Sequence, residues 1–550
     1  MTRKPATRRG RLAQSVRELA YARSVYRFML SGRVAKPTIC PLDIWQGDPD
    51  NANAMFQGTF RAAGEEVSAP NDSPWSVVPP SATWLAELNC FDWLRDFRAA
   101  GGRAATQRAR DLTASWIETH ATWSRLAWRP DVLGRRVQAW VSHADFLTVE
   151  APAGFAEGFH ESLQLQLKHL HRAATRAPAG APTIAALVGL AGAEIAYQHR
   201  ARPRIKALRL LDDELENQIL ADGGHCERNP MVQHHLLRAL VGLRAALQSA
   251  DLKPTVPLQT AIDRMAPMLR FFRHGDGALA LFNGGLEDRR DDIDATLAAA
   301  NARGRPHVSA SHSGYERLSA GQTLVLMDIG GPPPSGTDDR AHAGCLAFEA
   351  SHGGERLIVN CGTALDRSGD WHSSMRATAA HSTVTVADTN SAQLKKDGTI
   401  GRRPVDVIVS RGEDELGNHI VETSHDGYAG ALGYRHHRRL ILDLSGEGMA
   451  GEDWLTASDG HPRRAQEQRF TARFHLHPSV SASLQQGGGA ILLRSGKGMG
   501  WLFLASGGDL SLEESAYLGD GRPRRTNQII LSAPISAQAI LTWALQRVAD

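Results

Sequence analysis

The spacing of apolar residues changes once along the chain, close to residue 305. Between about residues 85 and 300, apolar positions recur every three or four residues, and Gly, Pro or short polar turns separate the periodic segments. This spacing predicts amphipathic helices, for example over residues 91–102, 182–200, 204–224 and 231–250. Helical hairpins of about 40 to 50 residues cannot bury their apolar faces alone, so we expect an α/α array, either open or closed into a toroid.

Beyond residue 310 the period becomes two. Short runs rich in Val, Ile, Leu and Phe are bounded by Gly, Pro, Ser and Asp, as in TLVLMDIG, HIVETSH and RFTARFHLHP. About ten such runs predict a large antiparallel sandwich. The expected fold class is therefore a multidomain α+β protein, with an N-terminal (α/α) toroid or incomplete toroid followed by an antiparallel β-sandwich.

The length of 550 residues exceeds one ordinary hydrophobic core. We place a basic N-terminal segment and extension at residues 1–80, the α/α toroid domain at 81–305 and the β-sandwich domain at 306–550. The last junction falls in NARGRPHVSASHSG, where neither period holds.

Composition narrows the class of protein. Hydrophobic residues make up 42% and charged residues 22%, and no apolar run has the roughly 20 residues that a membrane-spanning helix needs. Five cysteines form no CxxC pattern and their odd number leaves one unpaired, which argues against a disulfide-stapled secreted protein. Charged residues interrupt every candidate signal sequence. We expect a cytoplasmic protein, with the cell envelope or periplasm as the alternative.

The first 36 residues carry ten Lys or Arg and one acid, Glu18, although the whole chain has a net charge of only +3. As a helix, residues 12–31 would place apolar side chains along one side, namely Leu12, Val16, Leu19, Val25 and Met29. This helix either packs on its own domain with a basic solvated face or makes peripheral contact with an acidic membrane surface. The basic segment is too local to predict a nucleic-acid partner.

The segment DGGHCERNPMVQHH, residues 222–235, joins two predicted helices. Asn229 and Pro230 are suited to cap and open the second helix. Candidate side chains for binding an anion or exchanging a proton are His225, Glu227, Arg228 and Asn229, because a helix N-terminus favours negative charge. The alternative is a well-capped turn with solvated charges.

Two strand-like runs each begin with a histidine. His342 lies in RAHAGCLAFE, which opens with Arg340, and His381 lies in RATAAHSTVTVAD, which opens with Arg376. On neighbouring strands the two imidazoles could share a metal, but Asn360, which lies between them, is a poor zinc ligand. The alternative is a pair of histidines hydrogen-bonded inside the sandwich.

Tyrosine is scarce, and two of the seven stand beside His and Arg. Tyr315 lies at the domain junction and Tyr428 in a loop before a strand, where neighbouring cations would favour a phenolate. Both can instead be buried loop anchors, which we favour for Tyr428. A Walker loop, a GxGxxG after a strand, GxSxG and HExxH are absent, which argues against nucleotide-driven and α/β-hydrolase chemistry.

Together, DGGHCERNP, RAHAGCLAFE, RLIVNCGT and RATAAHSTVTV resemble the heparinase II/III family of polysaccharide lyases, over most of residues 80–545. The resemblance implies an (α/α) toroid joined to an antiparallel β-sandwich. It also implies β-elimination on uronic-acid-containing polysaccharides, such as glycosaminoglycans.

The resemblance further implies roles for individual residues. Asn229 or His225 matches the region that neutralises the uronate carboxylate, and Tyr315 is the nearest substitute for a tyrosine that acts as base or acid. The family's His-x-His-x-Asp run reads here as Arg340-Ala-His342-Ala-Gly344. Of the family's structural zinc ligands His342 and His381 persist, while Asn360 stands where an aspartate is expected.

From these residues we predict a lyase acting on an acidic polysaccharide or oligosaccharide. Asn229 and Arg340 would hold the carboxylate, Tyr315 or His342 would move protons, and His381 would orient its neighbour. The expected substrate-binding residues are His225, Glu227, Arg228, Arg376 and Tyr428. Structural Zn²⁺ would bind His342 and His381 with a third ligand undetermined. The alternative is a non-catalytic glycan-binding protein of the same fold at the cell envelope.

Overall fold

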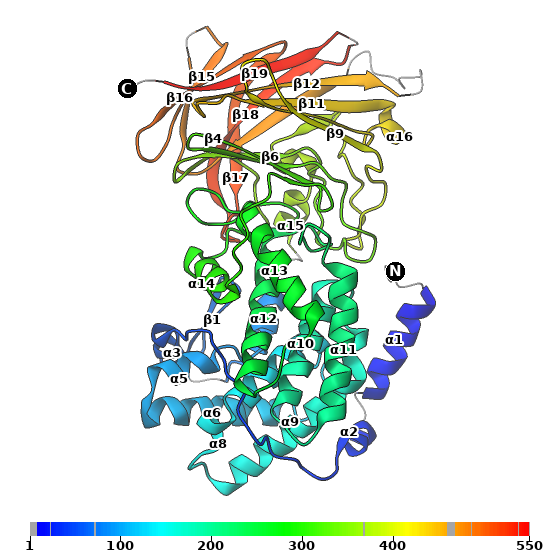
Figure 1. Cartoon of the computed structure of the whole chain (residues 1–550), viewed down its shortest axis with the longest axis vertical. Coiled ribbons are helices and arrows are strands. Elements are labelled where there is room, and N and C mark those ends of the chain that lie inside the picture. Colours follow the sequence, from blue (N-terminus) through cyan, green and yellow to red (C-terminus); the bar gives the residue numbers. More distant parts are fainter. Residues whose placement is uncertain are drawn as a thin grey trace. The chain divides into compact units, whose positions relative to one another are not determined.

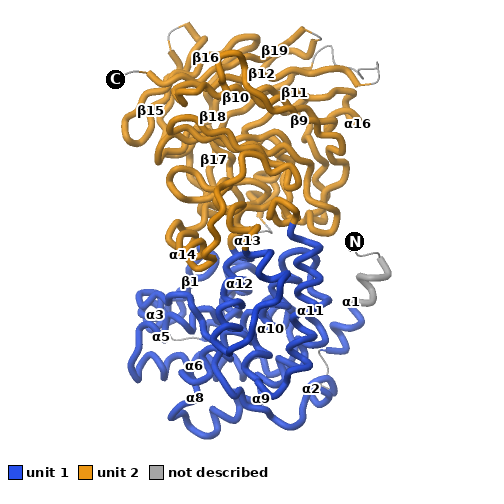
Figure 2. The backbone as a smooth tube through the Cα atoms, viewed as in Figure 1, with its two compact units in different colours: residues 1–219, 235–262, 365–367 blue, residues 220–234, 263–364, 368–550 orange. Residues whose placement is uncertain are grey.

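The computed structural model describes residues 8–21, 24–70, 73–366, 369–458, 468–485, 487–536 and 538–548. The chain divides into two compact units (Figure 2). Unit 1 comprises Met1–Ile219, His235–Ile262 and Leu365–Arg367, and unit 2 comprises Leu220–His234, Asp263–Ala364 and Ser368–Asp550. The segment 220–234, called the loop 220–234 although its last five residues begin helix α12, therefore belongs to the same unit as the sheets.

Unit 1 is helical apart from one hairpin (Figure 1). Its elements are α1 (Arg8–Tyr21), α2 (Ser24–Leu30), α3 (Pro49–Phe56), β1 (Thr59–Ala62), β2 (Glu65–Ser68), α4 (Ala82–Leu88), α5 (Leu94–Ala100), α6 (Gly102–Thr119), α7 (Pro130–Ser142), α8 (Ala144–Thr148), α9 (Ala153–Ala173), η1 (Ala174–Arg176), α10 (Ala181–Ile195), α11 (Ala201–Gln218) and most of α12 (Pro230–Ser249). Helices α7 and α10 pack closely where Gly134 and Gly189 meet. A Cβ added at Gly189 would lie only 2.2 Å from the Gly134 backbone.

Unit 2 holds two antiparallel sheets (Figure 1). The eight-stranded sheet has the order β14-β15-β16-β19-β12-β11-β10-β9, and the other has the order β17-β18-β13-β7-β6-β5-β4-β3, with β8 pairing β13. The strands are β3 (Ser309–Ala310), β4 (Tyr315–Ala320), β5 (Thr323–Asp328), β6 (Phe348–His352), β7 (Glu355–Val359), β8 (Val384–Val386), β9 (Val407–Glu413), β10 (His419–His425), β11 (Tyr434–Leu442), β12 (Gly448–Ala457), β13 (Arg469–Leu476), β14 (Ser481–Leu484), β15 (Ala490–Arg494), β16 (Gly500–Ser506), β17 (Asp509–Tyr517), β18 (Arg524–Pro534) and β19 (Ile540–Arg547). Its helices are the end of α13 (Val256–Phe271), α14 (Arg290–Ala300), α15 (Asp370–Met375), η2 (Thr378–Ala380) and α16 (Ala429–Leu432).

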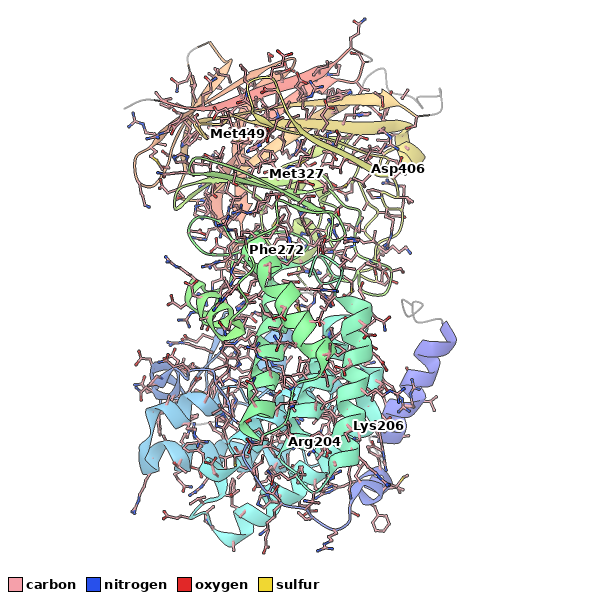
Figure 3. All side chains as sticks on the ribbon, in the orientation of Figure 1. Arg204, Lys206, Phe272, Met327, Asp406 and Met449 are labelled. Atoms are coloured by element: carbon pink, nitrogen blue, oxygen red, sulfur yellow. The ribbon has the colours of Figure 1, made fainter. Side chains whose placement is uncertain are left out.

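The inner faces of the two sheets share one hydrophobic core. Met327 on β5 and Met449 on β12, both labelled in Figure 3, belong to this buried cluster. Phe348 of β6 stacks on Trp543 of β19 with the ring centroids 5.5 Å apart. The predicted order of a helical region followed by an antiparallel β-sandwich is confirmed, because the change from period 3.6 to period 2 reflects two ways of burying one apolar face.

The basic N-terminus forms two helices, α1 and α2, where we expected one. Tyr26 binds His169 of the same unit, with 2.6 Å between the hydroxyl and Nδ1. Val16, Leu19 and Met29 are 60%, 69% and 61% exposed, so much of the predicted apolar side faces solvent. The Leu12 side chain lies outside the described residues. No helix in the described part of the chain is long and apolar enough to cross a membrane.

All five cysteines are free thiols.

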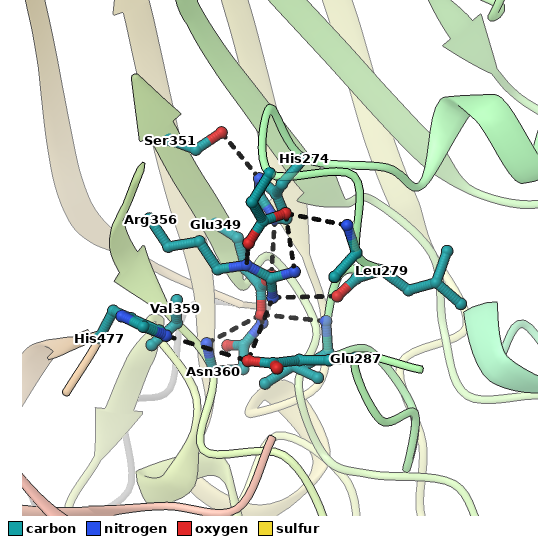
Figure 4. Close-up of polar contacts among 12 residues, drawn as sticks. His274, Leu279, Glu287, Glu349, Ser351, Arg356, Val359, Asn360 and His477 are labelled. Atoms are coloured by element: carbon teal, nitrogen blue, oxygen red, sulfur yellow. Dashed lines mark hydrogen bonds and ion pairs between the residues drawn. The ribbon is translucent and has the colours of Figure 1, made fainter. Parts of the chain in front are cut away.

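A buried polar network ties the segment after α13 to strands β6 and β7 (Figure 4). The Glu349 carboxylate lies 2.9 Å from His274 Nε2 and accepts hydrogen bonds from the Leu281 and Asn360 amides at 3.1 and 2.9 Å. Burial alone would raise the pKa of Glu349, but His274 and the backbone donors hold that pKa below its usual value.

A second buried charge completes this network. The Arg356 guanidinium binds the Asp276 carboxylate at 2.8 Å and the Leu279 carbonyl at 3.0 Å. Both contacts fall on the chain just before the turn 282–285, so the network fixes the position of that turn within unit 2.

We expect Glu349→Ala to lower the free energy of unfolding of unit 2 by about 3–5 kcal/mol, because it leaves buried donors and an imidazole without their acceptor. Urea unfolding, with hydrogen exchange of the amides of residues 274–288 as the local probe, measures this loss. Glu514→Ala is the control, since Glu514 is 71% exposed in its ion pair with Arg525. Equal stability of the two variants would contradict the assigned role of the network.

Candidate functional site

Asn229 caps helix α12, as its sequence position predicts. Its Oδ1 accepts hydrogen bonds from the Met231 and Val232 amides at 2.9 and 3.1 Å. Its Nδ2 donates to the Asn283 carbonyl at 2.8 Å. The amide group is therefore fixed in one orientation, and one Nδ2 hydrogen is left for another acceptor.

Arg228 joins the loop 220–234 to strands β4 and β5. The guanidinium of this buried residue donates to the Ser313 and Gly314 carbonyls at 2.7 and 2.9 Å, and also to the Gly331 carbonyl and the Asp328 carboxylate. These four acceptors occupy the side chain that we expected to bind substrate. Arg228 is a structural clamp.

Tyr315 is fully buried and points at the backbone of Arg228. Its hydroxyl donates to the Arg228 carbonyl and accepts from Asn283 Nδ2 at 3.1 Å. Burial raises the pKa of Tyr315 and outweighs the opposite effect of the Arg228 guanidinium, 4.8 Å from the ring. Our expectation of an easily formed phenolate is wrong because desolvation exceeds the attraction to the cation.

Three of the predicted site residues converge on Gly284. A Cβ added there would lie 2.9 Å from the Arg340 carbonyl oxygen, 3.3 Å from His342 Nε2 and 3.7 Å from Asn229 Nδ2. The φ of Gly284 is +79°, a value that favours glycine. The loop 220–234, the turn 282–285 and the segment 340–342 therefore meet at one point within unit 2.

His342 and His381 form a direct pair, with 3.0 Å between His342 Nδ1 and His381 Nε2. They lie in loops, because β6 begins at Phe348 and β8 at Val384, and these strands are not neighbours in the sheet. Our placement of the histidines on neighbouring strands is wrong. The alternative of two hydrogen-bonded histidines describes the observed contact.

The partners of this pair define its protonation. His381 Nδ1 lies 2.8 Å from the Ala377 carbonyl, which can only accept, so the proton sits on Nδ1. Burial lowers the pKa of His381 to about 4, so at neutral pH its Nε2 carries a lone pair. His342 Nδ1 must then donate to it. His342 Nε2 is left as a buried lone pair without a partner in the described part of the chain.

A zinc ion bound between these histidines would need His342 Nδ1 and His381 Nε2, which are hydrogen-bonded to each other. Asn360 offers no oxygen, because its Oδ1 accepts from the Ser382 amide at 3.0 Å. Cys361 Sγ lies 3.3 Å from His475 Nδ1. A third His, Cys, Asp or Glu does not complete the pair anywhere in the described ranges. The donor set fits Zn²⁺ poorly, and a bound metal stays a prediction.

Arg340 is half-buried, and no hydrogen bond or ion pair reaches its guanidinium from the described residues. Arg376, by contrast, donates to the Ala341 and Gly398 carbonyls at 2.8 and 2.6 Å. Arg376 thus holds the backbone next to His342, whereas the Arg340 guanidinium is the cation left for a ligand.

The other expected binding residues lie inside the protein. His225 and Glu227 are buried, and burial lowers the pKa of His225 to about 3. Tyr428 belongs to the sandwich core and donates to the Val384 carbonyl at 2.6 Å. Tyr428 is therefore the buried anchor that we favoured, and its hydroxyl is occupied by a backbone carbonyl.

Asn283 is the site residue that sequence reasoning missed. Its Nδ2 contacts Tyr315, Asp328 and the Arg228 carbonyl, and its Oδ1 accepts from the His342 amide at 3.4 Å. The sequence Phe282-Asn-Gly-Gly285 contains an Asn-Gly turn signal that could have drawn attention to it.

Comparison with known proteins identifies the family. The model of the family described as "Heparinase II/III-like, C-terminal" matches residues 302–544. FtsZ-localized protein C of Caulobacter vibrioides (strain NA1000 / CB15N) is 32% identical over 514 residues, which cover 91% of this chain and 88% of that protein. The chain belongs to the heparinase II/III family.

Solved structures extend the likeness of fold. The crystal structure of heparinase III has a TM-score of 0.73 at 14% identity, covering 98% of this chain and 91% of that chain. Heparan sulfate lyase HepC from Pedobacter heparinus has a TM-score of 0.61 at 15% identity, covering 96% and 87%. At these identities the likeness shows the fold alone, and it confirms the expected toroid and sandwich of this heparinase II/III family member.

We expect both histidines of the pair to be Nδ1–H tautomers and to stay neutral at pH 5.5, where an exposed histidine is mostly charged. The ¹⁵N chemical shifts of histidine-labelled protein report both properties. In His381→Ala the His342 proton loses its acceptor and is free to move to Nε2. An Nε2–H tautomer of His342 in the unaltered protein would contradict the assignment.

The free energy of unfolding should decrease as the pH falls from about 6.5 to about 4. In this range the His381 side chain binds a proton in the unfolded protein but not in the folded protein, where burial lowers its pKa. The unfolding free energy changes by about 1.4 kcal/mol per pH unit for each such histidine. Urea unfolding at several pH values should show a shallower slope for His381→Gln. An unchanged slope would mean that His381 titrates normally in the folded protein.

Proposed function

We propose that this heparinase II/III family member binds a uronate-containing oligosaccharide or polysaccharide at Gly284 and cleaves it by β-elimination. The observation that carries the proposal is the buried, unpartnered lone pair of His342 Nε2 beside the Asn229 amide. The neutral imidazole of His342 lies close to the free amide hydrogen of Asn229 and to the segment that carries Arg340. An uncharged base beside groups that can bind a carboxylate is suited to remove a proton from the neighbouring carbon.

The reaction needs a group that neutralises the carboxylate, a base and an acid. Arg340 and the remaining Asn229 N–H draw charge from the uronate carboxylate, so the proton on C5 becomes acidic. His342 Nε2 takes that proton as the C5–H bond breaks. The electron pair forms the C4–C5 double bond and expels the glycosidic oxygen on C4, which recovers the proton from the His342 imidazolium.

His381 is a positioning residue in this scheme. Its Nε2 accepts the Nδ1–H of His342 and so keeps the lone pair of His342 on Nε2, which lies 3.3 Å from a Cβ added at Gly284. Burial lowers the pKa of His342 in the ligand-free protein. A bound carboxylate next to the ring would favour the imidazolium and partly reverse that effect.

A second candidate function is non-catalytic glycan binding at the cell envelope. The name of the Caulobacter relative places that protein with FtsZ. Tyr315 is committed to a backbone carbonyl, and Asn229 and His342 are only 2% and 3% exposed, so a polymer reaches them only if neighbouring residues move. The basic N-terminus, with Leu19 and Phe28 exposed, would supply the contact with the membrane surface.

The test is the absorbance of the unsaturated uronate product when the full chain meets heparin, heparan sulfate, alginate and bacterial capsule preparations. We expect product with at least one of them and a loss of about a hundredfold or more in His342→Gln, since removing a general base costs about 10²–10⁴ in rate. Arg340→Gln should mainly raise KM. Arg125→Gln, a 77% exposed position, is the matched charge control.

Glycan-array binding of the same proteins separates the two candidates. Binding without product in the unaltered chain, retained in His342→Gln, would reject the lyase and select the non-catalytic function. Product formation that survives His342→Gln unchanged would reject the assigned base.

A further inference from the structure

Unit 2 contains a polar hollow of about 320 Å³. Four arginines line it, together with His274 and two glycines of the following turn: Arg270, Arg273, Arg290, Arg317, Gly275 and Gly277. Its volume lies at the lower end of the range for small-molecule sites. None of these residues takes part in the meeting point at Gly284.

Three of the four arginines lie in different elements. Arg270 lies in the last turn of α13, Arg290 opens α14, and Arg317 lies on β4. Gly277 keeps their meeting point open, because a Cβ there would lie 2.9 Å from Arg273 Nη2 and 3.0 Å from Arg290 Cδ. Its φ of +88° also favours glycine.

Acidic partners of these arginines are few. Asp294, 47% exposed, lies 2.7 Å from Arg273 Nη2 and 3.4 Å from Arg290 Nε. Among the described residues, Arg270 donates only to the Gly304 and Ala302 carbonyls, at 2.8 and 2.7 Å. No other carboxylate within the described ranges is ion-paired with the four arginines, so positive charge is in excess.

Arg317 shows the lack of hydrogen-bond acceptors most clearly. Its backbone is fixed in the sheet, but its Nε is buried and has no partner in the described part of the chain. Burial lowers the pKa of Arg317, and burial together with the nearby Arg273 lowers that of Arg270. A partly desolvated guanidinium without an acceptor is unfavourable, so a ligand that supplies oxygen atoms would stabilise this region.

We propose that this hollow binds a doubly charged tetrahedral oxyanion, either inorganic sulfate or the phosphate group of a small acidic ligand. The planar guanidinium presents parallel N–H groups that match such oxyanions in pairs. The excess of arginines over the single Asp294 calls for more than one negative charge, which distinguishes this ligand from a simple carboxylate. The site does not depend on lyase activity, since it shares no residue with the proposed reaction.

Calorimetric titration of the full chain tests the site, with inorganic sulfate or phosphate as probe and chloride holding the ionic strength constant. We expect saturable binding of one anion per chain, and acetate binding about tenfold or more weaker because it carries one charge. Arg317→Gln and Arg290→Gln should each weaken sulfate and phosphate binding about tenfold or more. Arg525→Gln, which removes a 78% exposed arginine of the same unit, should leave it unchanged.

Arg290 is 67% exposed, so Arg290→Gln tests the site even if Arg317→Gln does not fold. Tighter binding of either sulfate or phosphate supports the proposal and identifies which of the two anions the site prefers. Binding that is equal in Arg290→Gln and the unaltered chain would overturn it. The absence of saturable binding by both probes would overturn it as well.

Discussion

The buried ion pair between Arg228 and Asp328 is the interaction on which the candidate site depends. Both residues are at least nine-tenths buried, and the guanidinium also binds the backbone carbonyls of Ser313 and Gly314. One side chain therefore fastens the loop 220–234 to strands β4 and β5. The loop can hold Asn229 near Gly284 only because this clamp fixes the residue before it.

The same clamp explains why Tyr315 and Asn283 are where they are. The Arg228 carbonyl accepts from the Tyr315 hydroxyl and from Asn283 Nδ2, and Asn283 in turn bonds Asp328. A buried cation surrounded by satisfied partners is stable, whereas removal of one partner leaves an uncompensated charge. The tyrosine is thus part of the support of the site, and proton transfer falls to the His342–His381 pair.

Much of the architecture follows from apolar spacing, and the exceptions have a physical cause. Strand β10 occupies the run HIVETSH, His419–His425, as predicted. Strand β12 escaped notice because Gly451 and Asp453 stand at inward positions between Met449 and Leu455. Asp453 is buried in an ion pair with Arg438, so charge replaces an apolar side chain in the core. A period-two search for apolar residues cannot find such a strand.

The candidate site was predictable in part. The capping role of Asn229 follows from its place before Pro230, and the meeting of Asn229 with the Arg340–His342 segment agrees with the family resemblance. The roles of Arg228, Tyr315 and Tyr428 did not follow, because whether a polar side chain faces a ligand or a buried carbonyl depends on tertiary packing. The most direct test of the account is the ¹⁵N resonance of His342 Nε2 during titration with glucuronate, with glucose as the neutral control. The account predicts that glucuronate alone shifts this resonance toward the protonated form, and an unchanged resonance at saturating glucuronate would contradict it.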